Sequence, residues 1–328
     1  MIELILPAVV SCIVAFFVVF LMTPPLIKFL EKRNFTVKDV NKKENVLVAR
    51  PGGLSIIVGI IASEIVLYTF LQLNEILVIL FTTSIAFVIG YIDDRKYFKM
   101  HNQRWFKPIA LAIAAIPIIA FGAYTSDLAF PLFGTVQIPI LYLALIFLMI
   151  PITGNTINSI DVLNGVASGF MVIASFSLSI CLFITQNYEI AIVSLPLGFV
   201  SLAFYKYHKI PSKIFPGDSG ALTFGAMYGA IAIVGGVEII AAVALLPAVL
   251  NSFLFLSSVK QIRGKPVEHT DDFQLKATDD KTAPVTLVRL ILAGGSLSEK
   301  QVGFTIFKLG IFSGILAIIT AFMMGVSL

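Results

Sequence analysis

The sequence has few charged residues and very little cysteine. Only 13% of its 328 residues are charged, whereas roughly 25% is typical of a soluble domain. Its two cysteines, Cys12 and Cys181, lie in separate apolar segments, so the chain offers neither a disulfide framework nor a CxxC metal site. It also lacks a glycine-rich P-loop, a GxSxG nucleophile motif and a zinc-spaced set of His and Cys residues. The chain therefore lacks the motifs of P-loop nucleotide-binding enzymes, of hydrolases with a GxSxG nucleophile and of zinc enzymes.

Apolar segments occupy almost the whole length of the chain instead. Hydrophobic residues make up 58% of the sequence, and the mean hydropathy is +0.97. Many of the segments are long enough to span the hydrocarbon of a bilayer. The first one has no basic region before it and no small-residue cleavage site, so we do not expect a cleaved signal peptide. The sequence therefore predicts an all-α, polytopic integral membrane protein with one transmembrane domain over residues 1–328.

We expect about ten transmembrane helices. Their approximate ranges are 2–22, 53–72, 75–92, 108–124, 139–153, 166–186, 189–206, 220–235, 237–259 and 302–325. Five longer loops then lie on one side, at 23–52, 93–107, 154–165, 207–219 and 260–301. The loops on the other side are short, and one of them, residues 126–139, is expected to form a hairpin around Phe133 and Gly134.

The charges are distributed unequally between the two sets of loops. All 23 Lys and Arg residues lie in the five longer loops or at the helix ends on the same side. The short loops carry Glu75, Asp127, Glu189 and Glu238 instead. The positive-inside rule therefore places the longer loops in the cytoplasm and both termini outside. A basic cytoplasmic face suits anionic lipid head groups or a phosphate-rich substrate.

The stretch 154–165 is unusually polar for a segment between two apolar runs. Asn158, Asp161 and Asn164 are spaced three residues apart, so neighbouring members share a face if the stretch is helical. Asn155 joins the same patch. Amide and carboxylate oxygens are ligands that suit Mg²⁺, and polar groups at a membrane edge favour a functional site. The alternative is an inter-helix loop that happens to be rich in Asn.

Two further acidic motifs lie on the same predicted side. Asp93 and Asp94 end the third expected helix, and adjacent carboxylates favour a divalent cation or a general base over a simple helix end. Asp218, at the start of the eighth expected helix, is either a metal ligand or an N-cap. Lys107, at the end of the loop that follows Asp94, either neutralises a phosphate or anchors the helix at the membrane surface.

A basic segment follows the ninth expected helix. Arg263 and Lys265 could clamp a diphosphate, because guanidinium and ammonium groups bind phosphate oxygens. The alternative is a solvated basic loop, and for His269 this alternative is preferred.

Together these motifs resemble the polyprenyl-phosphate N-acetylhexosamine-1-phosphate transferase superfamily, the glycosyltransferase 4 family. The resemblance rests on IDD at 92–94, NTINSIDVLNG at 155–165 and FPGDSGALTFG at 215–225, in the family's order. Within the family it is closest to the dolichyl-phosphate GlcNAc-1-phosphate transferase branch and its archaeal relatives, on DVNK at 39–42 and YHKIPSK at 207–213.

Some positions depart from the patterns of particular branches. Arg263 and Lys265 stand where the eukaryotic enzymes carry an Arg-x-Arg-like motif and where the bacterial pentapeptide translocases carry a His-rich motif, so a peptidoglycan precursor is not the expected substrate. Asn164 matches the eukaryotic pattern, whereas Asp161 is an acid that this pattern lacks. Among the predicted metal ligands, Asn158 and Asp218 therefore rank above Asp161.

The resemblance implies transfer of N-acetylhexosamine-1-phosphate, with GlcNAc-1-phosphate as the first choice, from a UDP-sugar to a polyprenyl (dolichyl-type) phosphate. It implies Mg²⁺, or alternatively Mn²⁺, on Asn158, Asp218 and Asp161. The implied catalytic residues are Asp93, Asp94 and Lys107. The implied substrate-binding residues are Asn41, Lys42, Asn155, Asn164, Arg263 and Lys265.

The partners implied are the UDP-N-acetylhexosamine, the polyprenyl or dolichyl phosphate and membrane lipids, with no nucleic acid and with a homodimer as the family-based expectation. Glycoprotein lipid-linked oligosaccharide synthesis is the implied pathway. Two other classes stay open from the residues alone. An intramembrane prenyltransferase would also use acidic motifs and Mg²⁺. A nucleotide-sugar or lipid transporter would place its polar residues near the bilayer midplane, whereas these acids gather at helix ends.

Overall fold

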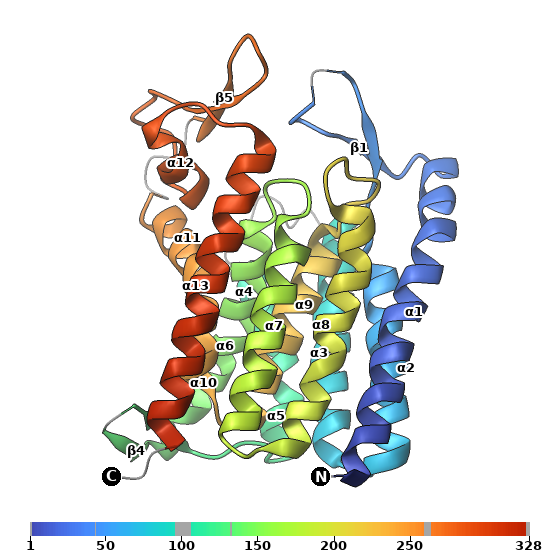
Figure 1. The fold of residues 1–328 in the computed structure, drawn as a ribbon, viewed down its shortest axis with the longest axis vertical. Coiled ribbons are helices and arrows are strands. Elements are labelled where there is room, and N and C mark those ends of the chain that lie inside the picture. The colour runs from blue at the N-terminus through green and yellow to red at the C-terminus, as the bar shows by residue number, and fades with distance from the viewer. Residues whose placement is uncertain (1, 43, 96–105, 132, 259–263, 326–328) are drawn as a thin grey trace.

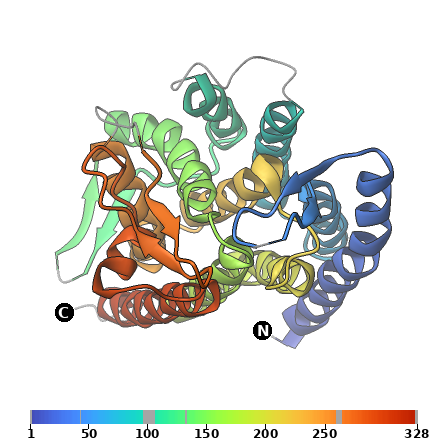
Figure 2. The same cartoon turned by 90° about the horizontal axis from the view of Figure 1, so that it is seen from above.

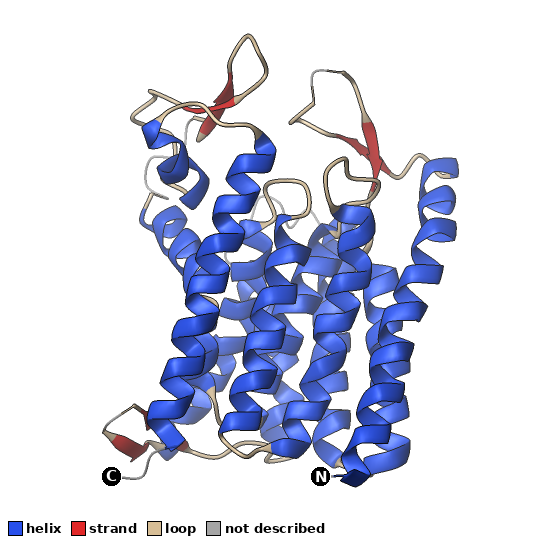
Figure 3. Cartoon of the chain, viewed as in Figure 1, coloured by secondary structure: helices blue, strands red, loops and turns tan. Residues whose placement is uncertain are grey.

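The structure is a computed structural model, and it describes residues 2–42, 44–95, 106–131, 133–258 and 264–325. These residues form a bundle of long helices that run roughly side by side (Figure 1). Short strands lie at the two ends of the bundle (Figure 3). The prediction of an all-α, polytopic membrane protein is confirmed.

The helices of the described residues are α1 (Ile2–Lys32), α2 (Gly53–Leu71), α3 (Asn74–Asp94), α4 (Phe106–Ala112), α5 (Ile116–Ala120), α6 (Pro139–Ile160), α7 (Val166–Ile184), α8 (Tyr188–His208), α9 (Gly217–Val234), α10 (Glu238–Ala244), α11 (Leu246–Ser257), α12 (Leu287–Ile291) and α13 (Glu299–Gly325). Single 3₁₀ turns cover Ile113–Ala115 and Leu292–Gly294. The strands are β1 (Thr36–Lys38), β2 (Leu47–Ala49), β3 (Asp127–Phe130), β4 (Gly134–Gln137), β5 (Val267–His269) and β6 (Leu275–Ala277).

The strands form three antiparallel hairpins, β1–β2, β3–β4 and β5–β6. The β3–β4 pair confirms the hairpin that the sequence predicts over 126–139. The other two hairpins lie inside loops for which the sequence predicted no strands. Three residues per strand leave too little alternation for a strand to be identified from the sequence.

Seven helices of the described residues are long and apolar enough to cross a membrane: α1, α2, α3, α6, α7, α8 and α13. The bent pair of α10 and α11 makes an eighth if it is counted as one span. The expected helix over 108–124 is a shorter apolar helix, Lys107–Ala120, that contains a 3₁₀ turn. The expected helix over 220–235 is α9, whose small residues suit contact with protein rather than lipid.

Three predicted helix boundaries are wrong. The first helix continues from 22 to Lys32 through Pro24 and Pro25. The helix predicted to end at 153 continues to Ile160, so the first half of the polar stretch is helical and only Asp161 to Gly165 form the turn. The helix predicted over 237–259 is broken, with a bend of 78° between α10 and α11. Pro247 lies in the first turn of α11, where its missing N–H needs no partner within the helix. In the middle of a continuous helix over 237–259, the same proline would remove a backbone hydrogen bond.

The two ends of the bundle carry the two sets of loops that the charge distribution predicts. Both termini lie at one end, and β1 and β5 lie at the other (Figure 1). The cytoplasmic location of the β1 and β5 end stays a prediction from the positive-inside rule.

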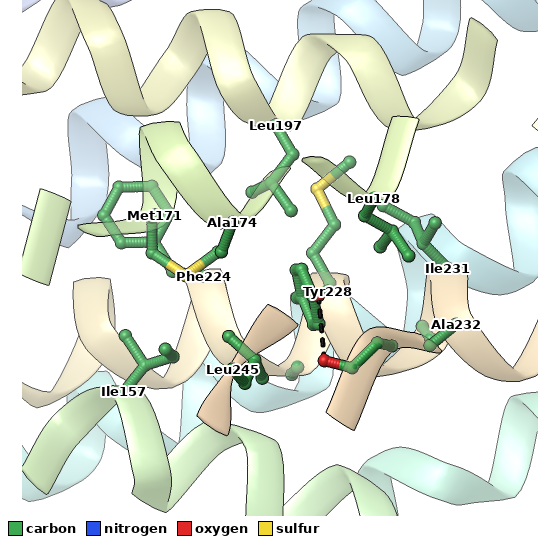
Figure 4. Close-up of a cluster of buried hydrophobic side chains, with 14 of the residues drawn as sticks. Ile157, Met171, Ala174, Leu178, Leu197, Phe224, Tyr228, Ile231, Ala232 and Leu245 are labelled. Carbon is green, nitrogen blue, oxygen red and sulfur yellow. Dashed lines mark hydrogen bonds between the residues drawn. The ribbon is translucent and has the colours of Figure 1, made fainter. Parts of the chain in front are cut away.

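Helix α9 lies inside the bundle and is enclosed by other helices (Figure 2). Every residue of α9 except Asp218 and Val234 is buried. Around Tyr228, the apolar side chains of α6, α7, α8 and α9 meet in a continuous core (Figure 4), and the Tyr228 hydroxyl donates to the Ala241 carbonyl at 3.1 Å. Small residues along α9 allow this burial, because helices in a membrane pack through close backbone approach.

Glycine makes the approach of α3 to α9 possible. A Cβ on Gly90 of α3 would lie 2.7 Å from the Asp218 carbonyl oxygen and 2.7 Å from the Ser219 Cα atom. Both atoms belong to the α9 backbone, which cannot rotate away as a flexible side chain can. The contact sets the distance between the end of α3 and the start of α9, where the acidic motifs lie.

We predict that Gly90→Ala destabilises the protein by about 1–3 kcal/mol, because the added methyl group overpacks a backbone contact. Thermal unfolding of the detergent-solubilised protein measures the change. Gly303→Ala is the matched control, since a Cβ on Gly303 of α13 would meet only the Val166 Cγ2 atom, at an ordinary 3.7 Å. Equal melting temperatures for the two variants would contradict the prediction.

Candidate active site

The site begins with two segments that are joined through their backbones. One follows β2 and the other leads into α9. The Phe215 amide donates to the Ala49 carbonyl at 2.9 Å, the Gly52 amide donates to the Phe215 carbonyl at 2.8 Å, and the Gly53 amide donates to the Pro216 carbonyl at 3.0 Å. This pairing fixes the β1–β2 hairpin against the start of α9. Residues from the first loop are thereby placed beside Asp218.

Asp94 accepts hydrogen bonds at the N-terminus of α9. Its carboxylate accepts from the amide of Asp218 at 3.0 Å, from the amide of Ser219 at 2.8 Å and from the Ser219 hydroxyl at 2.7 Å. At the C-terminus of α3 a carboxylate opposes the macrodipole of its own helix, but here it lies at the positive end of another helix. A Cβ on Gly217 would lie 2.7 Å from Asp94 Oδ2, so this position requires glycine.

Asp218 itself does not cap α9. The N-cap residue is Pro216, and no side chain of α9 caps its own first turn. The N-cap alternative for Asp218 is therefore not observed, and its carboxylate faces the neighbouring acids and cations instead.

Two cations hold the acidic side chains together. Lys107 Nζ lies 2.8 Å from Asp93 Oδ2 and also forms an ion pair with Asp218. Arg50 Nη2 lies 3.2 Å from Asp94 Oδ1 and 3.4 Å from Asp218 Oδ1. The three carboxylates come from α3 and α9, while the cations come from α4 and the segment after β2. Each cation bridges the two helices, which offsets the repulsion between like charges.

A cavity of about 340 Å³ lies beside this acidic cluster. Its walls include Asn41, Arg50, Asn158, Asp161, Asn164 and Asp218. Three of the predicted site motifs, which lie far apart in the sequence, therefore meet at one cavity.

Asp161 lies at the turn after α6, beside a buried histidine. His208 Nε2 of α8 lies 3.6 Å from Asp161 Oδ1, and His208 Nδ1 lies 2.8 Å from the Ser168 hydroxyl. Burial raises the pKa of the Asp161 carboxyl to about 7, and the nearby Arg50 cation opposes this rise. Burial therefore favours the protonated form of Asp161 more than it would for an exposed carboxyl.

A second polar cluster holds three residues that line the cavity, Asp39, Asn41 and Asn164. Glu299, at the start of α13, accepts from the Asn164 amide N–H at 2.9 Å and pairs with Lys42 Nζ at 2.8 Å. The Asn164 side chain donates to Asp39 Oδ2 at 2.8 Å, and Asn41 Nδ2 lies 3.5 Å from Glu299 Oε1. The predicted substrate-binding residues Asn41, Lys42 and Asn164 therefore form one network between three parts of the chain.

Two other predicted substrate-binding residues of the described chain, Asn155 and Lys265, do not line this cavity. The Asn155 side chain donates back to the Pro151 carbonyl of its own helix at 2.8 Å, and Asn155 is not among the cavity-lining residues of the described chain. Lys265 is exposed beside β5 and does not line the cavity either. Arg263 lies outside the described residues. Substrate binding stays a prediction for these three residues, as it does for Asn41, Lys42 and Asn164.

Three residues of the site, Arg50, Ser219 and Glu299, belong to no motif that identifies them in the sequence. Arg50 was one of many basic residues in a long loop, and its sequence neighbours carry no chemical signal. Ser219 directly follows Asp218, and no local pattern shows that its amide and hydroxyl donate to Asp94. Glu299 lies far from every motif in the sequence, and only the packing of α13 brings it to Asn164.

The described residues contain no group of three or more His, Cys, Asp or Glu side chains arranged as a metal site. Mg²⁺, however, commonly binds one or two carboxylates and completes its shell with waters and substrate phosphates. Asn158, Asp161 and Asp218 all line the cavity and supply oxygen donors. This donor set fits a hard divalent cation that is shared with a phosphate ligand.

Comparisons with known proteins decide the family. The model of glycosyl transferase family 4 matches residues 76–236. A predicted glycosyltransferase of Methanocaldococcus jannaschii is 30% identical over 309 residues, which cover 92% of this chain and 94% of that protein. The chain belongs to glycosyl transferase family 4.

Two more relatives of this family show which branches it is similar to. A predicted UDP-N-acetylglucosamine–dolichyl-phosphate N-acetylglucosaminephosphotransferase of Saccharolobus solfataricus is 29% identical over 322 residues, covering 96% of this chain and 97% of that protein. A phospho-N-acetylmuramoyl-pentapeptide-transferase of Staphylococcus epidermidis is 28% identical over 242 residues, covering 68% of this chain and 75% of that enzyme. The family resemblance of the sequence motifs is thus confirmed, and the protein is a membrane enzyme of family 4.

For this family 4 enzyme we predict that Asp94→Ala lowers the free energy of unfolding by about 1–3 kcal/mol, because the first amides of α9 lose their buried acceptor. Thermal unfolding measures the loss. Asp93→Ala is the matched comparison, since Asp93 pairs with Lys107 and accepts no α9 amide. The interpretation of Asp94 as a cap is wrong if Asp93→Ala destabilises the protein as much as Asp94→Ala.

Proposed function

We propose that this family 4 enzyme transfers N-acetylhexosamine-1-phosphate, with GlcNAc as the sugar, from a UDP-sugar to a dolichyl-type polyprenyl phosphate. The products are the polyprenyl-diphosphate-sugar and UMP. The observation that carries the proposal is the convergence of Asp93, Asp94 and Asp218 with Lys107 and Arg50 beside one cavity. The printed names of the archaeal relatives support the choice of UDP-GlcNAc and dolichyl phosphate as substrates.

Both substrates are anions, so their approach requires positive charge. Lys107 lies between Asp93 and Asp218 and is already desolvated, which places an ammonium group where a phosphate oxygen can contact it. Mg²⁺ or Mn²⁺ would be held by Asp218 and Asn158, with Asp161 next to them. When bound, such a cation neutralises charge on the diphosphate oxygens during phosphoryl transfer.

The reaction makes one bond and breaks one. An oxygen of the lipid phosphate attacks the β-phosphorus of the UDP-sugar, and the bond between that phosphorus and the oxygen bridging to the α-phosphate breaks. UMP leaves with this oxygen. A lipid phosphate is a competent nucleophile at neutral pH, so the role of Asp93 is to orient the phosphate or to take its remaining proton. Direct attack of this kind needs no covalent enzyme intermediate.

The cavity beside the acidic cluster is the proposed binding site for the nucleotide. Asn41 and Asn164 line it and are held by Asp39 and Glu299, so their positions are fixed before a ligand binds. Amide groups in fixed positions suit the recognition of a base by paired hydrogen bonds. Lys42 is held by the same Glu299 and stays a proposed contact to the nucleotide.

The distribution of Lys and Arg residues also predicts the side of the membrane on which the reaction takes place. The cavity lies at the β1 end of the bundle, which the charge distribution predicts to be cytoplasmic, where nucleotide sugars are made available to the enzyme. The first step of lipid-linked glycan assembly fits a cytoplasmic donor and a membrane-embedded acceptor. A homodimer stays the family-based expectation.

We predict lipid-dependent release of UMP when the detergent-purified protein is given dolichyl phosphate, UDP-GlcNAc and Mg²⁺. EDTA is expected to abolish the release. Asp218→Ala and Asp93→Ala are each expected to lower the rate by about 100-fold or more, because each removes a group that touches a reacting phosphate or its cation. Coupled detection of UMP measures the rate.

Asp271→Ala is the matched control, since it removes an exposed carboxylate on the same side of the protein, outside the site. It is expected to retain the wild-type rate. Turnover with a different UDP-sugar alone would keep the reaction class and change the sugar. The proposal fails if the folded wild-type protein releases no UMP from any UDP-sugar.

A further inference from the structure

Arg50 differs from the other cation of the acidic cluster in where it faces. Lys107 pairs with Asp93 and Asp218 and is not among the residues that line the cavity, whereas Arg50 lines it. The Arg50 side chain is 39% exposed, but that of its partner Asp94 is only 1% exposed. The guanidinium group therefore lies at the border between the buried acids and the space in which a ligand would bind.

The buried acid does not depend on Arg50 for its hydrogen bonds. Asp94 already accepts from two amides and one hydroxyl at the start of α9. Among the residues that the structure describes, Arg50 contacts Asp94 and Asp218 through Nη2 alone. Its Nε and Nη1 donors have no partner within that part of the chain. The acids therefore fix one edge of the guanidinium and leave the other edge available.

The backbone around Arg50 is equally well fixed. The Arg50 amide donates to the Phe35 carbonyl at 3.0 Å, and the preceding Ala49 carbonyl accepts from the Phe215 amide at 2.9 Å. The side chain thus projects from a backbone that is tied on both sides. A guanidinium with a fixed backbone and a fixed inner edge loses little freedom when its outer edge binds a ligand.

The chemistry of the available guanidinium edge indicates what that ligand is. Asp39, Asp161 and Asp218 line the cavity together with Lys38 and Arg50, so an anion that enters needs these cations to offset the repulsion from three carboxylates. A planar guanidinium binds phosphate through two parallel N–H···O bonds and offsets this repulsion. We propose that Arg50 binds the diphosphate of the nucleotide substrate through its Nε and Nη1 edge, while Asp94 and Asp218 hold the Nη2 edge. This inference rests on the proposed function, because it takes the cavity as the nucleotide site.

If Arg50 contacts the diphosphate and not the nucleoside, its loss weakens the binding of UDP but not that of uridine. UDP carries the diphosphate, and uridine lacks it. We predict that Arg50→Ala weakens the binding of UDP by about 10- to 100-fold, as expected for the loss of charge-assisted hydrogen bonds, and leaves the binding of uridine unchanged. Arg50→Lys keeps the charge without the planar fork and is expected to show an intermediate loss. Isothermal titration calorimetry on the purified protein with Mg²⁺ measures both ligands.

Arg33→Ala is the matched control. It removes one positive charge from the same end of the protein, at an exposed arginine that lies over the Phe29 ring and does not line the cavity. It is expected to bind UDP as the wild type does. Unchanged UDP affinity in Arg50→Ala would overturn the proposal, and so would an equal loss of UDP and uridine affinity, which would show that Arg50 only shapes the cavity.

The same measurements separate this inference from the proposed function. If the wild-type protein binds neither UDP nor uridine, the assignment of a nucleotide substrate is wrong, and the role of Arg50 falls with it. If the wild type binds UDP and releases UMP from a UDP-sugar but Arg50→Ala does the same with equal affinity, only the role of Arg50 is wrong.

Discussion

The site depends on one contact between helix ends, the Asp94 carboxylate at the N-terminus of α9. Its two oxygens accept the first amides of α9 and thereby join the C-terminus of α3 to the start of the buried helix. The contact places Asp93, the residue before Asp94, on the same side as Asp218. Both Lys107 and Arg50 can then pair with acids from two helices at once. The acidic cluster is stable because helix dipole, amides and cations all oppose its negative charge.

The burial of α9 makes this contact possible. A helix enclosed by other helices gains stability from close packing rather than from apolar contact with lipid, so α9 carries small residues where the lipid-facing helices carry large ones. Gly90 and Gly217 extend the same principle to the site, since each allows a backbone or a carboxylate to approach where a side chain would interfere. The polar chemistry stays at the end of the bundle, and the core around Tyr228 stays apolar (Figure 4).

Much of the candidate site could be predicted from the sequence because its residues are conspicuous in an apolar chain. Asp93, Asp218, Asn158 and Asp161 stand out against their surroundings, and the structure brings Asn158, Asp161 and Asp218 to one cavity. The catalytic role of Asp94 stays a prediction, and the structure adds that its carboxylate accepts the first amides of α9. Asn41, Lys42 and Asn164 were predicted one by one, but their common partner Glu299 was not. An ion pair between residues so far apart in the sequence leaves no local pattern.

The sequence by itself determined the class of the protein, its approximate helices, the sidedness of its charges and the family to which it belongs. These properties follow from composition and from short motifs, which depend on residues close together in the chain. The tertiary structure decided how α3 meets α9, that Asp94 serves the helix start, that Arg50 lines the cavity and that α10 and α11 bend apart. These properties depend on which distant backbones approach each other, and the fit of side chains between packed helices fixes that approach.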